Sequence, residues 1–502
     1  MAKIAFISLY DQAAYGLRML SACLKKAGHR RHIIFLKRYA NGRKTARVKL
    51  YEGETPWQGI DHLGNAFVYA VSNDITDAEK ALLVDVLGGL KADLIGMTVN
   101  SPLKQRAIAV TALIKAKFPD TPVVWGGFEP TINPEASLRY CDIACRGEAE
   151  QTLVELADAV EAGATSGNIP NLCVRDNGGA KQNELYPPEK DLDSLPFQDC
   201  DPAGNFFIDE DEVHESPAFL SQIKEFYSTI SGRGCVYQCS YCCERYLKDL
   251  YRPHSFLRRR SPQNMVDELE AVKRQHTIRH VIFQDEVFSH QMGWLEEFIP
   301  LYKERIGLPF TGYVMPSVDF ERKLRLLKDG GLARTCLAFQ TGSQRINKFY
   351  KRGFDKELTL KAADIIRSLD ISHYVDVITY NPEERKEDLE ATLDVLLRFP
   401  RPYDICVNKL YVSAGTELAE WFKGAQPEIA DGKMFDYYAS LFWLSSYFNC
   451  SKQIVHAIES LPFFGSHPCA LKPILYVAWL ARFADRVRRK LKRMAKAAIR
   501  RR

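Results

Sequence analysis

The sequence predicts an α/β protein of three parts: an N-terminal Rossmann-like parallel sheet, a partial (β/α)6 barrel and a mostly helical C-terminal region. Short apolar runs alternate with segments of helical periodicity over residues 1–165, which is typical of parallel sheets built from βαβ units. The same alternation returns six times between residues 226 and about 415, as expected of a partial barrel. A chain of 502 residues has room for two or three such domains.

The first domain, residues 1–165, opens with the buried strand Lys3–Leu9. A helix over Gly16–Gly28 follows, since Leu17, Leu20, Leu24 and Ala27 recur on one helical face. Thr76 and Glu79 form a capping box that starts a later helix. We expect further strands at His32–Leu36, Asp93–Val99 and Pro122–Trp125, and helices at Leu103–Phe118 and Gln151–Ala162.

Two segments of this half lack clear periodicity. Residues 37–75 form an insertion, and residues 166–225, with several Pro, Gly, Asn and Asp, are expected to be a linker. The barrel then spans 226–424 and the helical region 425–502. Ser261-Pro262 is a helix start within the barrel, with Pro at the first helical position.

Polar residues follow the predicted barrel strands, where chemistry gathers in β/α barrels. Together they offer carboxylates for an ammonium group, hydroxyls and amides for a ribose, and a cation for a carboxylate. The strands are expected to end near Arg233, Glu286, Pro316, Thr341, Asn381 and Ser413, and the candidate site residues at these ends are Asp285, Glu286, Ser317 and Gln340.

Bulk properties place the chain in a reducing cytoplasm. Its 13 Cys are odd in number and scattered, and the chain is far too long for a disulfide scaffold. The first residues run straight into an apolar strand, so no signal peptide is expected. No apolar run approaches the ~20 residues of a membrane-spanning helix.

Cys235-Val-Tyr-Gln-Cys239-Ser-Tyr-Cys242 is the most informative motif. Three thiolates in one loop can hold three irons of a 4Fe–4S cluster and leave the fourth iron open. A zinc site needs four N/S ligands, and no second close Cys or Cys/His pair follows. A redox dithiol of Cys239 and Cys242 would leave Cys235 unexplained. Cys243 is expected to be a packed Cys, although a catalytic role stays open.

The motif, with the aromatic Tyr241 before its last Cys, resembles the cluster-binding signature of the radical S-adenosylmethionine (radical SAM) superfamily. The resemblance implies that the open iron binds S-adenosylmethionine (SAM), which the reduced cluster splits to a 5′-deoxyadenosyl radical. Three downstream segments are similar to elements of the same family: Phe339–Gln344 to the nucleoside contact, Tyr350–Arg352 to a basic element that meets the carboxylate, and Asp376–Glu383 with Glu387-Asp388 to the fifth strand and its helix. Arg352 and Tyr241 therefore join the candidate cofactor-binding residues.

The loop after the first strand, Asp11-Gln-Ala-Ala-Tyr-Gly16, aligns with the cobalamin-binding signature Asp-x-His-x-x-Gly. Ala13 stands where the His should be, so this position cannot ligate cobalt. The layout nevertheless resembles the cobalamin-dependent class of the superfamily, and either cobalamin binds without that ligand or the domain keeps the fold without a corrin. The candidate cofactor-binding residues here are Asp11, Tyr15, Gly16, Thr98, Ser101, Gly126, Gly127 and Glu148.

These resemblances predict an enzyme that uses a 4Fe–4S cluster, SAM and cobalamin to methylate an unactivated carbon or phosphorus of a small-molecule or lipid-like substrate. An electron donor such as flavodoxin or ferredoxin is expected. Two further hypotheses stay open: a radical SAM cyclase or rearrangement enzyme without methyl transfer, and a non-enzymatic corrin-binding scaffold.

The basic charge is concentrated at the C-terminus. Arg482 to Arg502 holds eleven Lys/Arg against Asp485, a net charge of +10, so the other 481 residues sum to −5 in a chain of net charge +5. Phe483, Val487 and Leu491 recur at helical spacing among the cations, which favours peripheral contact with the inner membrane surface. A solvated basic helix would fit the same pattern, and no base-reading module indicates nucleic acid.

Overall fold

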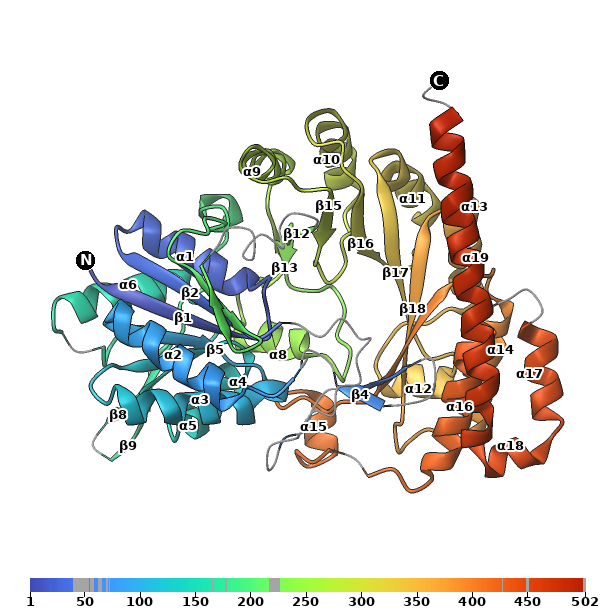
Figure 1. Ribbon diagram of the computed structural model, residues 1–502, viewed down its shortest axis with the longest axis horizontal. Helices are drawn as coiled ribbons and strands as arrows, with labels where there is room; N and C mark the ends of the chain where they lie inside the picture. The colour runs from blue at the N-terminus through green and yellow to red at the C-terminus, as the bar shows by residue number, and fades with distance from the viewer. Residues whose placement is uncertain are drawn as a thin grey trace.

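The computed structural model describes residues 1–38, 54, 58–61, 66–68, 71, 73–164, 166–176, 178–215, 226–426, 428–447 and 451–499. Two sheets lie side by side, the N-terminal sheet at the blue end of the chain and the barrel sheet toward the red end (Figure 1). This is the α/β architecture that the alternation of strands and helices predicts.

The first sheet has nine strands in the order β11-β10-β2-β1-β5-β6-β7-β8-β9. Its central strands are parallel and apolar, so helices must cover both faces. One core lies under α1 and α6, and another under α2 and α3. The central strands are β1 (Lys3–Leu9), β2 (Arg30–Leu36), β5 (Leu94–Thr98), β6 (Val123–Gly126) and β7 (Ile143–Cys145). The helices are α1 (Tyr15–Lys26), α2 (Asp77–Leu90), η1 (Ser101–Leu103), α3 (Lys104–Lys117), α4 (Phe128–Ile132), α5 (Pro134–Ser137) and α6 (Glu150–Glu161).

The predicted elements of this domain are confirmed to within two or three residues at their ends. The capping box is formed as expected: the Thr76 hydroxyl accepts from the Glu79 backbone N–H at 3.1 Å, and the Glu79 carboxylate accepts from the Thr76 N–H at 3.0 Å. These elements could be predicted because their signals are local: an apolar run indicates a buried strand, and a capping residue indicates where a helix begins.

Residues 166–225 are more than a linker, and that interpretation needs correction. The segment supplies four strands to the first sheet, β8 and β9 at one edge and β10 and β11 at the other. These strands are only three to five residues long and are flanked by Gly, Pro and Asn, so their composition resembles that of a loop. The bounds are β8 (Leu172–Asp176), β9 (Gly179–Gln182), η2 (Leu192–Ser194), β10 (Phe206–Asp209) and β11 (Glu212–His214).

The second sheet contains six parallel strands, as predicted, in the order β12-β15-β16-β17-β18-β19. Its strands are β12 (Phe226–Thr229), β15 (His280–Phe283), β16 (Phe310–Val314), β17 (Leu332–Gln340), β18 (Ser372–Thr379) and β19 (Asp404–Lys409), and a two-stranded ribbon, β13 (Gly232–Arg233) with β14 (Arg258–Arg259), lies beside them. The helices are α8 (Cys243–Leu250), α9 (Pro262–Gln275), α10 (Met292–Arg305), α11 (Phe320–Asp329), α12 (Gln344–Phe349), α13 (Lys356–Ser368) and α14 (Lys386–Arg398).

A hairpin from the 37–75 insertion extends this second sheet. β3 (Gln58–Ile60) pairs antiparallel with β19, and β4 (Ala66–Val68) pairs with β3. The insertion is therefore part of the barrel sheet although it belongs to the first domain in sequence. The rest of the insertion is largely outside the described residues.

The C-terminal region is helical, as expected, and shares one hydrophobic core with the barrel. Helix α16 packs on α14 and β19. Within the described residues, no helix combines the length and the apolar character needed to cross a membrane. The elements are α15 (Glu417–Trp421), α16 (Gly432–Ser445), α17 (Ser451–Glu459), α18 (Pro462–Ser466), η4 (Pro468–Leu471) and α19 (Lys472–Ile499).

Candidate active site

The cysteine loop lies between the β13 ribbon and the start of α8. Cys239 is buried, whereas Cys235 and Cys242 are half-buried. The intervening Ser240 fixes the loop: its N–H donates to the Tyr350 carbonyl at 3.0 Å, its hydroxyl donates to the Phe349 carbonyl at 3.0 Å, and its carbonyl accepts from the Leu418 N–H at 3.1 Å. The loop is therefore held in place by α12 and α15 before any metal binds.

The three sulfurs suit a cluster better than a single ion. Among the described residues, the one group of three or more His, Cys, Asp or Glu side chains with ligand atoms all within 4.8 Å of one another is His29, Asp158 and Glu161, far from this loop in sequence. The cysteine sulfurs are thus spread wider than one tetrahedral zinc ion requires. Burial raises the pKa of Cys235 to about 11, so the metal-free thiol is protonated and metal binding must displace its proton.

Arg352 joins this loop to the barrel interior. One guanidinium nitrogen donates to the Tyr241 hydroxyl at 3.1 Å and lies 3.7 Å from the Cys239 sulfur. The other donates to the Ala338 carbonyl on β17 at 2.8 Å. Tyr241 packs edge-on against Tyr350, with ring centroids 5.1 Å apart. The structure therefore brings Arg352, Tyr241 and Cys239, all of them predicted site residues, into one contact group.

Gln340 ends β17 in a conformation that needs explanation. Its φ of 68° lies in the left-handed region, which costs energy for a residue other than glycine. Its side-chain oxygen is buried without a hydrogen-bond partner among the described residues. An unmet buried acceptor is costly, so a donor group of a ligand at this point would offset a real penalty.

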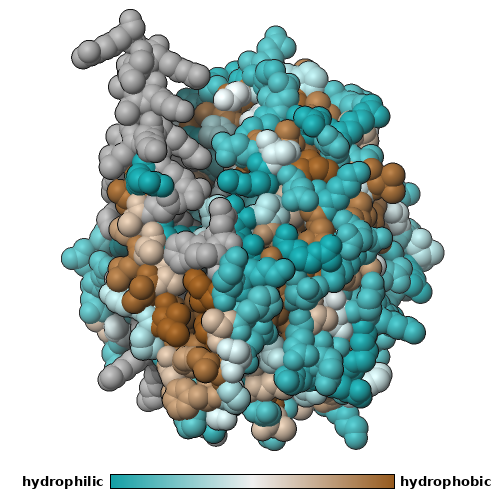
Figure 2. All heavy atoms as spheres, turned by 90° about the vertical axis from the view of Figure 1, so that its right-hand side faces the viewer, coloured by the Kyte–Doolittle hydropathy of each residue, from teal (hydrophilic) through white to brown (hydrophobic). Residues whose placement is uncertain are grey.

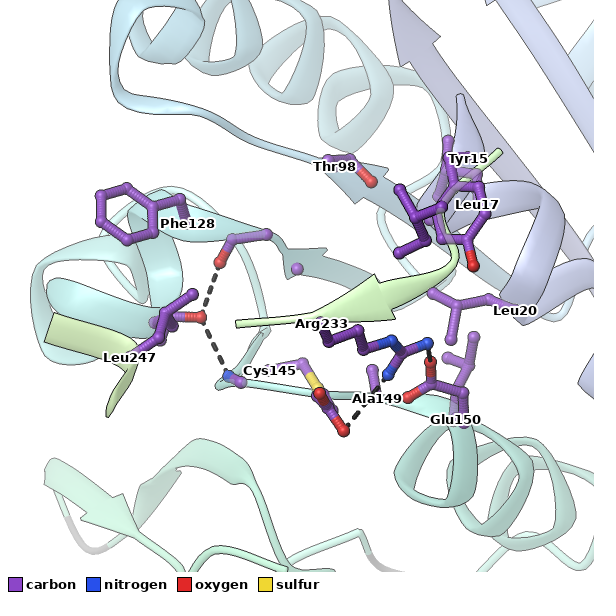
Figure 3. Close-up of a pocket in the computed structure, with 18 of the residues that line it drawn as sticks. Tyr15, Leu17, Leu20, Thr98, Phe128, Cys145, Ala149, Glu150, Arg233 and Leu247 are labelled. Carbon is purple, nitrogen blue, oxygen red and sulfur yellow. Dashed lines mark hydrogen bonds and ion pairs between the residues drawn. The ribbon is translucent and has the colours of Figure 1, made fainter. Parts of the chain in front are cut away.

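A cavity of about 410 Å³ separates the two domains, within the size range of small-molecule sites. First-domain loops form one wall, and the ends of the barrel strands with α8 form the other (Figure 3). Apolar side chains such as Leu17, Leu20, Phe128 and Leu247 project into it. Eight of the predicted cofactor-binding residues line it: Tyr15, Gly16, Thr98, Gly126, Gly127, Glu148, Asp285 and Glu286.

A buried ion network ties the two walls together. Glu148 of the first domain accepts from Arg258 at 2.5 and 2.9 Å and lies 3.2 Å from Arg233. Arg233 reaches Glu150 at 2.5 Å, a contact visible in Figure 3. Burial alone would raise the pKa of Glu148, but the two arginines hold it below its usual value. The backbone is tight here as well, because a Cβ on Gly147 would overlap the Tyr251 hydroxyl.

The barrel wall of the cavity carries two acids. Asp285 is buried and accepts from the Ser231 N–H at 2.9 Å and from the Ser231 hydroxyl. Burial raises the pKa of Asp285, and burial together with the neighbouring Asp285 raises that of Glu286. Glu286 lines the cavity with its side chain exposed there, so its carboxylate is accessible to a ligand ammonium group.

Six of the fourteen predicted cofactor-binding residues do not line this cavity, and neither do the three cysteines. Tyr241 and Arg352 lie at the cysteine loop and Gln340 at the end of β17, as described above. The other three bond elsewhere in the protein. Asp11 is exposed and accepts from the Ala14 N–H at 3.0 Å, at the start of α1. The hydroxyl of Ser101 donates to Glu129 at 2.6 Å, and that of Ser317 donates to Asp319 at 2.7 Å. All three side chains bond within the protein, so a polar residue after a strand does not by itself indicate a ligand contact.

Apart from Glu148, the residues that form the buried ion pairs of this site were not predicted from the sequence. Arg233, Glu150 and Arg258 form much of the wall and its support, yet no motif marked them. The one signal in the sequence was the run Arg258-Arg259-Arg260, three cations in a segment that becomes largely buried.

Two protein families match parts of the chain. Residues 229–396 match the family model described as the radical SAM superfamily. Residues 7–157 match the B12 binding domain.

The chain belongs to the radical SAM superfamily and carries a B12 binding domain.

Individual relatives are distant. An uncharacterized methyltransferase of Pyrococcus horikoshii is 22% identical over 70% of this chain and 73% of its own. The anaerobic magnesium-protoporphyrin IX monomethyl ester cyclase of Rubrivivax gelatinosus is 24% identical over 65% of this chain and 57% of its own. The solved structure of the radical SAM methyltransferase TsrM from Kitasatospora setae, with cobalamin and a 4Fe–4S cluster bound, has a TM-score of 0.60 at 17% identity, over 85% of this chain and 80% of that one. The last of these shows a shared fold.

The family implies SAM, a 4Fe–4S cluster and cobalamin, and the residues present fit these groups. Three cysteine thiols are spaced for a cluster, and Gln340 offers an unpaired acceptor in the barrel. The interdomain cavity has a wall lined with glycines (Gly16, Gly126 and Gly127), which lets a flat ligand approach the backbone. No histidine is found among the described residues that line it, and Ala13 is exposed outside it. The residues of this wall therefore provide no imidazole ligand.

Glu384, just after β18, gives a prediction about pH. Burial raises its pKa to about 8, well above the 4.5 of an ordinary glutamate, and the Thr379 hydroxyl donates to it at 3.0 Å. The folded state therefore keeps a proton that the unfolded state has lost, so Glu384 lowers stability as pH rises from 4.5 toward 8. We expect Glu384→Gln to gain stability relative to the natural protein over this window, by up to about 1.4 kcal/mol per pH unit. Urea unfolding of both proteins at several pH values measures it, and a pH-independent difference would contradict it.

Proposed function

We propose that this radical SAM enzyme methylates an unactivated carbon or phosphorus of a small-molecule or lipid-like substrate with the help of cobalamin. The observation that carries the proposal is the shared cavity, because its walls combine the loops of a B12 binding domain with Asp285 and Glu286 of a radical SAM barrel. Both cofactors act on the same substrate in such a reaction, so their binding sites must open into one common space.

When bound, the cluster and SAM supply a radical that removes a hydrogen atom, and cobalamin supplies the methyl group. The chain's own residues would position these groups. Cys235, Cys239 and Cys242 would hold the cluster, and Arg352 would orient the loop through Tyr241. Glu286 and Gln340 would bind the ammonium and hydroxyl groups of SAM. Burial of the cavity wall would exclude water, which otherwise quenches reactive intermediates.

The direct test is anaerobic reconstitution with iron, sulfide and cobalamin, followed by reduction in the presence of SAM. We expect formation of 5′-deoxyadenosine, and with a true substrate a product heavier by one CH2 unit. Absence of the nucleoside from protein with a full iron content would contradict the proposal.

A separate prediction concerns the cobalt ligand. Because no histidine lines the described cavity wall and residue 13 is alanine, cobalamin should bind without an imidazole from the protein. The nitrogen splitting in the electron paramagnetic resonance spectrum of protein loaded with paramagnetic cobalamin should be the same whether or not the protein's histidines carry ¹⁵N. A change in the splitting on labelling would show an imidazole ligand from the protein and contradict this prediction. The readout does not depend on turnover.

A second candidate function is cyclisation or rearrangement without methyl transfer. The similarity to the Rubrivivax cyclase is the observation that favours this reaction. Product mass distinguishes it from methylation, because cyclisation removes hydrogen or leaves the mass unchanged. The loops that line the cavity are compatible with either outcome.

For location and partners, we propose a reducing cytoplasm, which the cluster requires, and electrons from a carrier such as flavodoxin or ferredoxin. We also propose that the enzyme works at the inner surface of the membrane. The basic C-terminal tail, with a net charge of +10, supports this placement.

A further inference from the structure

Helix α19 is apolar on two faces over its first four turns. Leu475 and Ala478 are buried in the core shared with the barrel, and Arg482, on the same side of the helix, is also buried. The guanidinium of Arg482 donates to the Asp404 carboxylate at 2.6 Å and to the Tyr403 carbonyl at 2.7 Å, at the start of β19. The inner face thus fixes the orientation of the helix on the body of the protein.

The outer face presents a second stripe to solvent. Tyr476, Leu480, Phe483 and Val487 recur at i, i+4, i+7 and i+11, the spacing of one helical face, and each is at least 42% exposed. Val477 beside them is 64% exposed. A surface helix normally directs polar residues outward, so an ordered apolar stripe on the outer face indicates a contact that the isolated chain does not satisfy.

Helix α18 adds to the same region of the molecule. Both α18 and α19 pack against η4, the short turn between them. Leu461 and Phe463 are 52% and 57% exposed, and the Phe463 ring lies on His467 with ring centroids 4.7 Å apart. Figure 2 shows hydrophobic side chains gathered along the left of the face that contains these helices. Seven of the twelve exposed large hydrophobic residues of the described chain thus belong to α18, its first flanking residue and α19.

Charge identifies the occupant of this surface. From Arg486 to Arg502 the sequence has ten Lys/Arg and no acid, whereas residues 1–481 sum to −5. An anionic lipid surface is attracted to the tail and repelled by the body, so it would meet the protein at the α19 end. A second copy of the chain would instead bring two strongly basic tails together. A nucleic acid would use the cations but leave the apolar stripe in water.

We infer that the exposed faces of α18 and α19 form a membrane-docking surface that inserts Leu461, Phe463 and the outer stripe of α19 into the interface of an anionic bilayer. The apolar side chains supply burial and the following cations supply attraction to the headgroups, as in interfacial amphipathic helices. The helix lies along the membrane without crossing it. The surface is built by residues outside the cofactor cavity, so the inference stands independently of the reaction.

The test uses the full-length protein and sedimentation with vesicles of phosphatidylcholine, with or without phosphatidylglycerol. We expect binding to the mixed vesicles that weakens with added salt and is weak on pure phosphatidylcholine. Leu480→Glu should lower the partition coefficient at least about tenfold, because it removes a buried leucine and adds a charge to the inserted face. Phe463→Glu should act in the same direction.

Ala481→Glu is the matched control, since it adds the same charge at the next position, which is exposed but lies off the stripe. It should weaken binding by no more than about fivefold, the effect of one charge near an anionic surface before screening by salt. If Leu480→Glu and Ala481→Glu lowered vesicle binding equally, the loss would come from net charge alone, and the proposed insertion would be wrong. No binding by the natural protein would overturn it as well. Self-association that Leu480→Glu abolishes, without vesicle binding, would assign the surface to a second copy instead.

Discussion

Replacing Cys235, Cys239 or Cys242 singly by alanine is expected to remove the cluster and abolish formation of 5′-deoxyadenosine. Each thiolate would hold a separate iron, and a cubane with only two protein ligands is poorly retained. Iron content should fall from about four per chain to well below that value, together with the visible absorption of the cluster. Chemical iron and sulfide analysis on anaerobically purified protein gives the measurement.

Cys243→Ala is the control for this set. Cys243 is adjacent to Cys242 and its thiol contacts that of Cys242, yet it lies at the first residue of α8, outside the three-cysteine spacing. We expect this variant to keep its iron and its nucleoside product. If Cys243→Ala lost iron while any of the other three variants kept it, the ligand assignment would be wrong.

The second large effect is expected at the interface of the two domains. Glu148→Gln leaves Arg258 buried with a neutral partner, and both side chains are mostly excluded from water, at 16% and 5% exposure. Removing one partner of a buried ion pair typically costs about 3–5 kcal/mol. We therefore expect the free energy of unfolding to fall by about 3 kcal/mol, measured by urea unfolding of the metal-free protein.

Two further variants separate this effect from a general loss of charge. Asp329→Asn removes an exposed pair with Lys303, in which both side chains are more than half exposed, and should change stability little. Combining Glu148→Gln with Arg258→Met should cost less than the sum of the two single changes, because the stranded charge is gone. Additive losses would mean that the pair is not coupled.

Local sequence signals predicted those parts of the fold that are determined locally. The apolar run Lys3–Leu9 and the capping box at Thr76 define their elements without help from the rest of the chain. Strands such as β8 and β10 depend instead on their neighbours in the sheet. Leu172 and Phe207 are buried there, but their segments are short and lie between turn residues. Such strands can be predicted only when the neighbouring strand at the edge of the sheet is known.

The candidate site follows the same division. The three cysteines and Tyr241 lie within one short segment of the sequence, so their spacing alone predicts a cluster loop. Contacts such as Glu148 to Arg258 join residues 110 positions apart, and no local pattern encodes that pairing. Of the polar residues at strand ends, Asp285 lines the interdomain cavity. Ser317 does not, because its hydroxyl bonds Asp319 in the next turn.

The pairing of β3 with β19 has a consequence for how this enzyme is made. Ile60 is registered against Val407, so the last barrel strand completes its hydrogen bonds only with a segment synthesised hundreds of residues earlier. The edge of β3 that faces β19 must remain unpaired until β19 leaves the ribosome, which makes completion of the sheet a late event in biosynthesis. A fragment beginning at residue 226 would present β19 as a bare strand edge and would be prone to aggregate. The catalytic half of the molecule therefore depends on the amino-terminal half for its solubility.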